Sequence, residues 1–452
     1  MPRSFHKSGL YLAVLLILFG CEFRVPERPR IITVSNAPAF RPVKPEDVNT
    51  EEQAIWAIMT ACKGISALPI TDPLHVHLYK NTASLAFYGH GWSTLPIDVD
   101  NQSASAQPNK ILVNLEATPK KPFGLIRVLA HEYGHTIEYS LAGQKLVTPN
   151  WFSEGFADWI TAKILDALRW QDYSITVQGA REELLAYKNN VPKISYFMWD
   201  QNWVSERGKP KGLIRTYRLA FVAVNVLIEK KGLPAVMGYI RTGKFESSFG
   251  VSLNNFSTEV EQYLADTPRP RLTQFRIAQP NWRVGDQWTY LEQRFGRKII
   301  LRKKFTKEEL FNGVLAVVVE INGGEILYDK ETLGAVAAVK NGKLVASTNT
   351  RPQELLWPLE SRKEWQNSFT VRDLLHNSNE TVEQLMVVTG EEEIKVPGGS
   401  FEAVKIEAFG TKSGNLLAEY WYSPTVKWFV KSRTYDYEDG IKEQELLSFK
   451  VD

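Results

Sequence analysis

The stretch His131-Glu132-Tyr133-Gly134-His135, HEYGH in one-letter code, determines how the rest of this chain is interpreted. Two histidines four residues apart lie one above the other on the same face of an α-helix, where both imidazoles can bind one metal ion. Glu132 points about 100° around the helix from His131, because an α-helix has 3.6 residues per turn. It therefore flanks such a metal without having to bind it, which is the position of a general base for a water molecule.

A catalytic zinc ion is held by three protein ligands and keeps a fourth position for water. The stretch Trp151–Trp159, WFSEGFADW, follows the first motif and supplies the third ligand, Glu154. Asp158 lies four residues further, on the same face of the predicted helix, and can accept a hydrogen bond from a ligand histidine. The sequence therefore predicts a Zn²⁺ site of His131, His135 and Glu154, with Asp158 behind the ligands.

HEYGH followed by WFSEGFADW resembles the gluzincin metallopeptidases and is most similar to the bacterial peptidase MA-like domains. The resemblance covers about residues 69–266. It implies an α+β fold class, with a gluzincin-like domain of a small sheet and active-site helices. It also implies hydrolysis of peptide bonds by a metal-activated water, with Glu132 as the general base. Tyr217 matches an oxyanion donor of similar aminopeptidases, while the alternative role for Tyr217 is packing in the core.

The sequence favours an endopeptidase but leaves two other functions open. A zinc aminopeptidase is the first, although the Gly-x-Met-Glu-Asn motif that binds the substrate's free amine in such enzymes is absent ahead of His131. An envelope binding or assembly lipoprotein with a structural zinc site is the second. The presence of Glu132 favours an enzyme over a binding or assembly lipoprotein, because a purely structural zinc site needs no general base.

The N-terminal residues are typical of a targeting segment. Arg3 and Lys7 precede an apolar run that is too short to span a bilayer comfortably, and the run ends in Leu18-Phe19-Gly20-Cys21. These four residues resemble a bacterial lipobox, which implies a signal peptide over residues 1–20 and lipidation of Cys21. An ordinary signal peptide or a short membrane anchor is the alternative. We therefore expect a lipid-anchored protein of the bacterial cell envelope, facing the periplasm or the exterior.

The composition is that of a globular protein with room for two domains. The chain has 452 residues, of which 44% are hydrophobic and 23% are charged. Its formal net charge is only +3, and two of these charges leave with the signal peptide, which argues against a nucleic-acid partner. A peptide or protein substrate is what the gluzincin resemblance implies. Once Cys21 is lipidated, Cys62 is the only other cysteine, so no internal disulfide can form.

Changes of pattern along the chain predict its domains. Residues 21–45 form a tether, residues 46–266 the zinc peptidase domain, and residues 267–283 a linker rich in proline and arginine. Residues 284–452 alternate like strands and form an antiparallel β-rich accessory domain. The segments predicted as strands there are 288–292, 315–321, 344–348, 393–396, 403–408 and 418–422.

Helical and strand patterns also frame the metal motif. Helices are predicted over 51–65, from Pro122 to a stop at Gly143, from an N-cap at Asn150, and over 215–231. The strand predicted over 110–115 precedes the metal helix. The gluzincin resemblance implies that this strand is a sheet edge that pairs with extended substrate, and an interior strand is the alternative.

Overall fold

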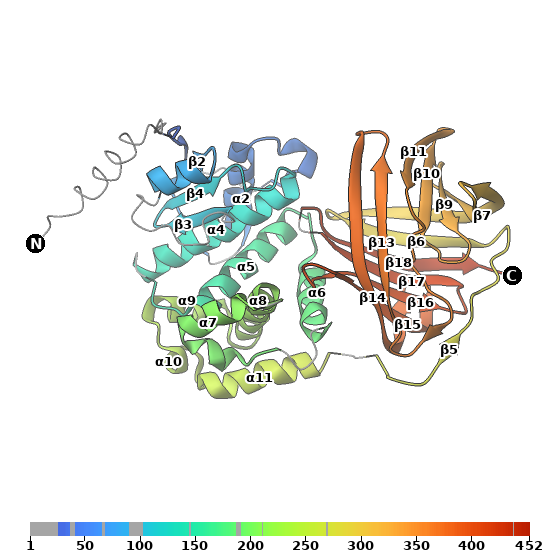
Figure 1. Ribbon diagram of the computed structural model, residues 1–452. Coiled ribbons are helices and arrows are strands. Elements are labelled where there is room, and N and C mark those ends of the chain that lie inside the picture. The colour runs from blue at the N-terminus through green and yellow to red at the C-terminus, as the bar shows by residue number, and fades with distance from the viewer. Residues whose placement is uncertain are drawn as a thin grey trace, which may run out of the picture. The chain divides into compact units, whose positions relative to one another are not determined.

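The structure is a computed structural model that describes residues 26–36, 41–65, 68–89, 103–143, 146–186, 191–209, 211–267, 270–436 and 438–452 (Figure 1). The chain divides into two compact units, and each unit is built from several segments. The first unit takes its described residues from 1–148, 152–168 and 227–251, and the second from 149–151, 169–226 and 252–452. The predicted signal peptide, lipobox and Cys21 lie outside the described residues. None of the described helices is both long and apolar enough to cross a membrane.

The first unit contains a small mixed sheet in the order β1-β2-β4-β3. Its strands are β1 (Arg30–Val34), β2 (Leu74–Tyr79), β3 (Ala104–Gln107) and β4 (Lys110–Asn114). The parallel pairing of β2 with β4 and the antiparallel hairpin of β3 with β4 place β4 inside the sheet. The expectation that residues 110–115 form an edge strand is therefore wrong, because β3 folds back on β4 and occupies that edge.

Three helices of the first unit follow the predicted pattern closely, namely α2 (Glu51–Gly64), α4 (Pro122–Ala142) and α5 (Asn150–Ala167). The unit also contains α9 (Leu233–Thr242) and α10 (Phe245–Phe249), which the sequence pattern did not predict. Proline opens α4, and Gly143 ends it in the left-handed conformation with φ of 69°. Asn150 is the first residue of α5 rather than its cap. Helices α2 and α9 both pack on α4, which places α4 in the core of this unit.

The second unit combines helices with a large β structure. The helices are α6 (Tyr173–Ala186), α7 (Asp200–Arg207), α8 (Gly212–Lys231) and α11 (Leu253–Ala265). Helix α8 contains the predicted helix over 215–231 and begins three residues earlier. Its last residues, from Leu227, belong to the first unit.

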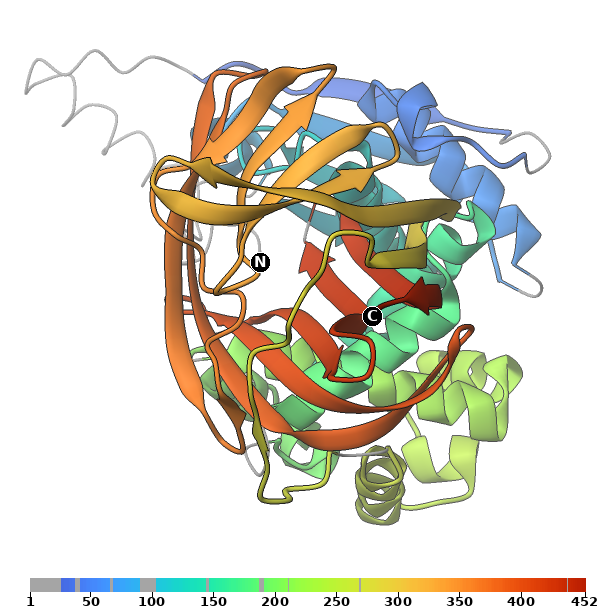
Figure 2. The same ribbon diagram turned by 90° about the vertical axis from the view of Figure 1, so that its right-hand side faces the viewer.

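In the part of the chain that the structure describes, twelve antiparallel strands close into a barrel (Figure 2). They are β6 (Gln287–Arg294), β7 (Arg297–Phe311), β8 (Val314–Ile321), β9 (Gly324–Asp329), β10 (Ala335–Lys340), β11 (Lys343–Thr348), β13 (Glu364–Asp373), β14 (Ser378–Val396), β15 (Gly399–Gly410), β16 (Leu416–Ser423), β17 (Trp428–Asp436) and β18 (Gly440–Lys450). Each strand pairs with its neighbour in the chain, and β18 pairs with β6 to close the ring. Two short strands, β5 (Arg276–Ile277) and β12 (Leu359–Glu360), form a separate pair.

The expected fold class, a gluzincin-like domain followed by an antiparallel β-rich domain, is wrong. The β half is a closed barrel, and helices α6, α7 and α11 belong to the same unit as the barrel. The six strands predicted from the sequence are all found, but they are too few to reveal a closed ring. Closure is favoured because it pairs the backbone N–H and C=O groups that the edges of an open sheet leave exposed.

Three hairpins of the barrel turn on asparagine–glycine pairs. In each pair both residues have a positive φ, as a two-residue type I′ turn requires. These pairs are Asn312-Gly313 between β7 and β8, Asn322-Gly323 between β8 and β9, and Asn341-Gly342 between β10 and β11.

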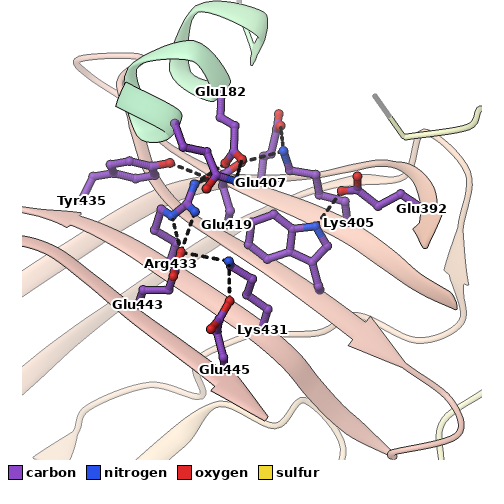
Figure 3. Close-up of polar contacts among 12 residues, drawn as sticks. Glu182, Glu392, Lys405, Glu407, Glu419, Lys431, Arg433, Tyr435, Glu443 and Glu445 are labelled. Carbon is purple, nitrogen blue, oxygen red and sulfur yellow. Dashed lines mark hydrogen bonds and ion pairs between the residues drawn. The ribbon is translucent and has the colours of Figure 1, made fainter. Parts of the chain in front are cut away.

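The inner and outer faces of the barrel wall differ in chemistry. Val404, Ile406 and Ala408 of β15 pack in the main hydrophobic cluster inside the barrel. The alternate residues of β15, Lys405 and Glu407, therefore lie on the outer face, where they are nevertheless buried. This outer face of β15–β18 is covered by α6 (Figure 3).

A network of charged side chains, which we call the wall network, fills the space between α6 and the barrel (Figure 3). Its members are Glu182, Lys405, Glu407, Glu419, Lys431, Arg433, Glu443 and Glu445. The Lys405 Nζ atom lies 2.6 Å from Glu419 Oε1, and Lys431 Nζ lies 2.8 Å from Glu445 Oε1. The guanidinium group of Arg433, which is fully buried, donates hydrogen bonds to Glu443 of the barrel and to Glu182 of α6. The wall network therefore joins α6 to the barrel through the hydrogen bond from the Arg433 guanidinium group to Glu182.

The wall network has one proton shared between two carboxyl groups. Burial and the nearby Glu419 carboxylate raise the pKa of Glu182 well above 4.5. Burial alone would also raise the pKa of Glu419, but Lys405, the hydrogen bond to Glu182, and Arg433 together lower it. The proton therefore resides mainly on Glu182, and Glu419 stays ionised.

We expect the stability of the second unit to fall as pH rises above about 4.5. In this range the folded chain keeps the Glu182 proton that the unfolded chain has lost, so stability decreases by about 1.4 kcal/mol per pH unit until Glu182 ionises in the folded chain. Glu182→Gln, whose amide cannot ionise, should flatten this slope. Calorimetric melting temperatures across this pH range, with the exposed Glu380→Gln as control, measure it. An unchanged slope in Glu182→Gln would contradict the shared proton.

Candidate metal centre

Helices α4 and α5 approach each other closely at a glycine. A Cβ atom placed on Gly134 of α4 would lie 2.8 Å from the Cα atom of Ala157 in α5, so only glycine allows this spacing. Gly134 lies directly before His135, and Ala157 lies three residues after Glu154. The small side chains therefore bring the histidines of one helix to the carboxylate of the other.

Gly134→Ala should push the two helices apart. In an ordinary helix this change would stabilise by up to about 1 kcal/mol, but overpacking against a backbone atom costs about 1–3 kcal/mol, so we expect a net loss. The melting temperature and the zinc retained after dialysis should both decrease. Gly238→Ala is the matched control, since Gly238 of α9 has no atom within 4 Å of its added Cβ and should be neutral or slightly stabilising. Unchanged zinc content in Gly134→Ala would contradict this role of the glycine.

Three donor atoms converge between α4 and α5. The His131 Nε2 atom lies 3.0 Å from Glu154 Oε2 and 3.2 Å from His135 Nε2. The third distance, from His135 Nε2 to Glu154 Oε2, is 3.7 Å. Ligands at about 2.0–2.1 Å from a tetrahedral zinc ion are separated by about 3.3 Å. The structure thus brings together the three predicted ligands, with a spacing that fits zinc.

The outer nitrogen of each histidine has its own partner. The His131 Nδ1 atom lies 2.9 Å from Asp158 Oδ1. The His135 Nδ1 atom lies 3.2 Å from Ser153 Oγ and 3.5 Å from Glu138 Oε2. Ser153 Oγ donates to Glu138 Oε2 at 2.5 Å and can accept the His135 N–H at the same time. These contacts orient both imidazoles with Nε2 toward the converging point.

Charge also favours a cation at this point. Burial lowers the pKa of His135, but its contacts with Glu138 and Glu154 raise it to about 10. Burial likewise lowers the pKa of His131, and hydrogen bonds to Asp158 and Glu154 more than reverse this effect. Burial would raise the pKa of Glu154, yet the two histidines hold it well below its usual range. The donor set therefore stabilises positive charge, as a site for a divalent metal must.

Glu132 lies beside the donors without joining them. It is half-buried, and it is not part of the group whose ligand atoms converge. Burial raises the pKa of its carboxyl group, while the nearby His135 and His131 lower it. Glu132 is therefore close enough to be influenced by the charges of the site, and the three converging ligand atoms come from other residues.

The structure also places Tyr217, which the sequence predicts as a site residue, and Glu138, which it does not. Tyr217 belongs to the second unit, where its ring centroid lies 5.6 Å from that of Trp203 and 5.5 Å from the Arg207 guanidinium carbon. Its role as an oxyanion donor stays a prediction. The sequence analysis did not identify Glu138, although it lies three residues after His135 and hence on the same helical face.

No protein-family model and no curated protein matches this chain. Part of this chain is similar to three solved structures. A “putative lipoprotein” from Parabacteroides distasonis is 15% identical, with 39% of this chain and 100% of that chain covered and a TM-score of 0.19. A “putative exported protein with YmcC-like fold” from Bacteroides fragilis is 14% identical, with 39% and 100% covered and a TM-score of 0.22. The “hypothetical lipoprotein YmcC” from Escherichia coli is 11% identical, with 36% and 84% covered and a TM-score of 0.26.

The assignment to the gluzincin metallopeptidases, and to their peptidase MA-like domains, is wrong. No family model matches the chain, and the described residues contain a closed barrel that the gluzincin resemblance does not imply. The resemblance rests on a few residues of two helices, and a site of this kind can be placed on more than one fold. An envelope location and lipidation of Cys21 stay predictions.

Proposed function

We propose that this chain hydrolyses peptide bonds with the help of a zinc ion held by His131, His135 and Glu154. The observation that carries the proposal is the convergence of three ligand atoms with Glu132 beside them but outside the ligand set. A structural zinc site is usually closed by four protein ligands, whereas three ligands leave a position for water and substrate.

The zinc ion, when bound, supplies a Lewis acid that lowers the pKa of a water molecule and polarises the scissile carbonyl. Glu132 takes a proton from the attacking water and later gives it to the amide nitrogen that leaves. The C–O bond forms first and the C–N bond breaks in the following step, when the nitrogen receives the proton, so the products are a carboxylic acid and an amine. Burial raises the pKa of Glu132, so its carboxylate accepts the proton more readily than an exposed carboxylate would.

Other residues of the first unit would position the ligands. Asp158 orients His131, and the Ser153–Glu138 pair orients His135, so each imidazole presents Nε2 to the metal. A secondary proposal, which comes from the sequence, is that Tyr217 donates a hydrogen bond to the oxyanion. Measuring peptide cleavage by the Tyr217→Phe variant would test it.

An envelope binding or assembly lipoprotein with a structural metal is the second candidate. It is in keeping with the descriptions of the three similar structures. The deciding experiment compares wild type with Glu132→Gln in zinc content and in cleavage of peptides with blocked N-termini. Blocked peptides also separate an endopeptidase from an aminopeptidase, since an aminopeptidase requires a free amine.

A further inference from the structure

One ammonium group, that of Lys303, lies inside the barrel, and no described residue forms an ion pair with it. Lys303 of β7 stands opposite Trp288 of β6 in the strand register, on the face that also carries Leu301 and Phe305. These neighbours pack in the hydrophobic cluster of the barrel, whereas Arg302 and Lys304 on the alternate face are exposed. The Lys303 side chain therefore points into the barrel.

Two aromatic rings lie close to this ammonium group. The Lys303 Nζ atom lies 4.9 Å from the centroid of the Tyr290 ring and 5.3 Å from that of the Trp428 ring. Within the described part of the chain, neither a hydrogen bond nor an ion pair reaches Nζ. Burial lowers the pKa of Lys303 to about 8, so the group is still mainly charged at neutral pH. Contact with ring faces offsets only part of the cost of burying this charge.

The nearby carboxyl groups already have other partners. Glu292 lies 3.1 Å from Lys442 Nζ and accepts a hydrogen bond of 2.6 Å from Gln444. Glu354 hydrogen bonds with Tyr420. Neither carboxyl group pairs with Lys303, so an anion supplied from outside the chain would be its first counter-ion.

The wall beside Lys303 is apolar over several residues. The Trp428 ring contacts Tyr328 edge-on at 5.2 Å and lies 6.4 Å from Trp282, which in turn lies 6.4 Å from Trp357. A ligand that suits these surroundings has one negative charge and a long apolar body, because one cation stands at the end of a row of aromatic rings.

We propose that the interior of the barrel binds a carboxylate amphiphile, with its carboxylate on Lys303 Nζ and its chain along Leu301 and Tyr328, which border the aromatic cluster and are only partly buried. This inference is independent of the metal centre. It assigns the barrel a binding site for a fatty-acid type of ligand.

Calorimetric titration of the full chain with laurate tests the proposal, with dodecanol and glucuronate as comparison ligands. Laurate should bind, and should bind about ten- to hundredfold more tightly than dodecanol, as expected for one charge-assisted hydrogen bond. Absence of laurate binding, or equal binding of laurate and dodecanol, would overturn the proposal. Glucuronate binding as tightly as laurate would also overturn it, because the site would then select a sugar acid rather than an apolar chain.

Lys303→Met locates the site, and Lys304→Met is its matched control on the exposed face of the same strand. Lys303→Met should lose the preference for laurate over dodecanol, while Lys304→Met should keep it. Melting temperatures show whether both variants fold. If Lys303→Met does not fold, Lys303→Arg should retain the preference for laurate and Lys304→Met should still match wild type. Retention of the preference in a folded Lys303→Met variant would place the carboxylate elsewhere and refute the assignment.

Discussion

Glu132→Gln is expected to abolish most peptide cleavage while leaving zinc bound. Glutamine keeps the size and shape of the side chain but cannot take a proton, and a positioned general base contributes about 10²- to 10⁴-fold to the rate. Because the converging ligand atoms come from His131, His135 and Glu154, the variant should still hold about one zinc ion per chain. Elemental analysis after dialysis and cleavage of blocked peptides give the two measurements.

Two variants make this result interpretable. Asp166→Asn, a carboxyl-to-amide change near the end of α5, should keep both zinc and activity. Glu154→Ala should lose zinc and activity together. If Glu132→Gln retained the full rate, Glu132 would not be the base. If wild type bound zinc but cleaved no peptide, the lipoprotein with a structural metal would be favoured.

Arg433→Met is expected to destabilise the second unit by about 3–5 kcal/mol, because removal of one partner leaves buried carboxylates without compensation. Arg433 is fully buried, and its Nη2 atom lies 2.5 Å from Glu443 Oε2. It also bridges Glu419 of the barrel and Glu182 of α6. Methionine replaces much of the volume of the aliphatic part of arginine. The decrease in the free energy of unfolding is therefore due mainly to the missing positive charge. Calorimetry should show a lower melting temperature for this unit.

A double variant separates lost charge pairing from lost packing. Adding Glu443→Gln to Arg433→Met removes one of the unpaired carboxylates and should recover part of the loss. Arg302→Met, at an exposed position of β7, is the control and should change stability by less than about 0.5 kcal/mol. A loss below about 1 kcal/mol in Arg433→Met would show that the wall network is solvated.

The sequence by itself determined the elements that depend on short-range periodicity. Helix α4 begins at Pro122 and ends before Gly143 as predicted, because proline at the first turn and glycine after the last are local requirements. The spacing of His131 and His135 places both imidazoles on one face in any α-helix. The three asparagine–glycine pairs are also local signals, because such pairs favour two-residue hairpin turns. More strands of the barrel could have been predicted from them.

Only the tertiary structure decided features that join distant segments. Glu154 meets the histidines because Gly134 and Ala157 let two helices approach, and no local pattern reports that distance. The barrel closes through pairing of β18 with β6, whose residues lie about 150 positions apart, for example Gln444 and Glu292. Lys303 became a candidate ligand-binding residue only when closure turned one face of β7 inward. Periodicity specifies which face of a strand is apolar, but the pairing of remote strands decides what that face encloses.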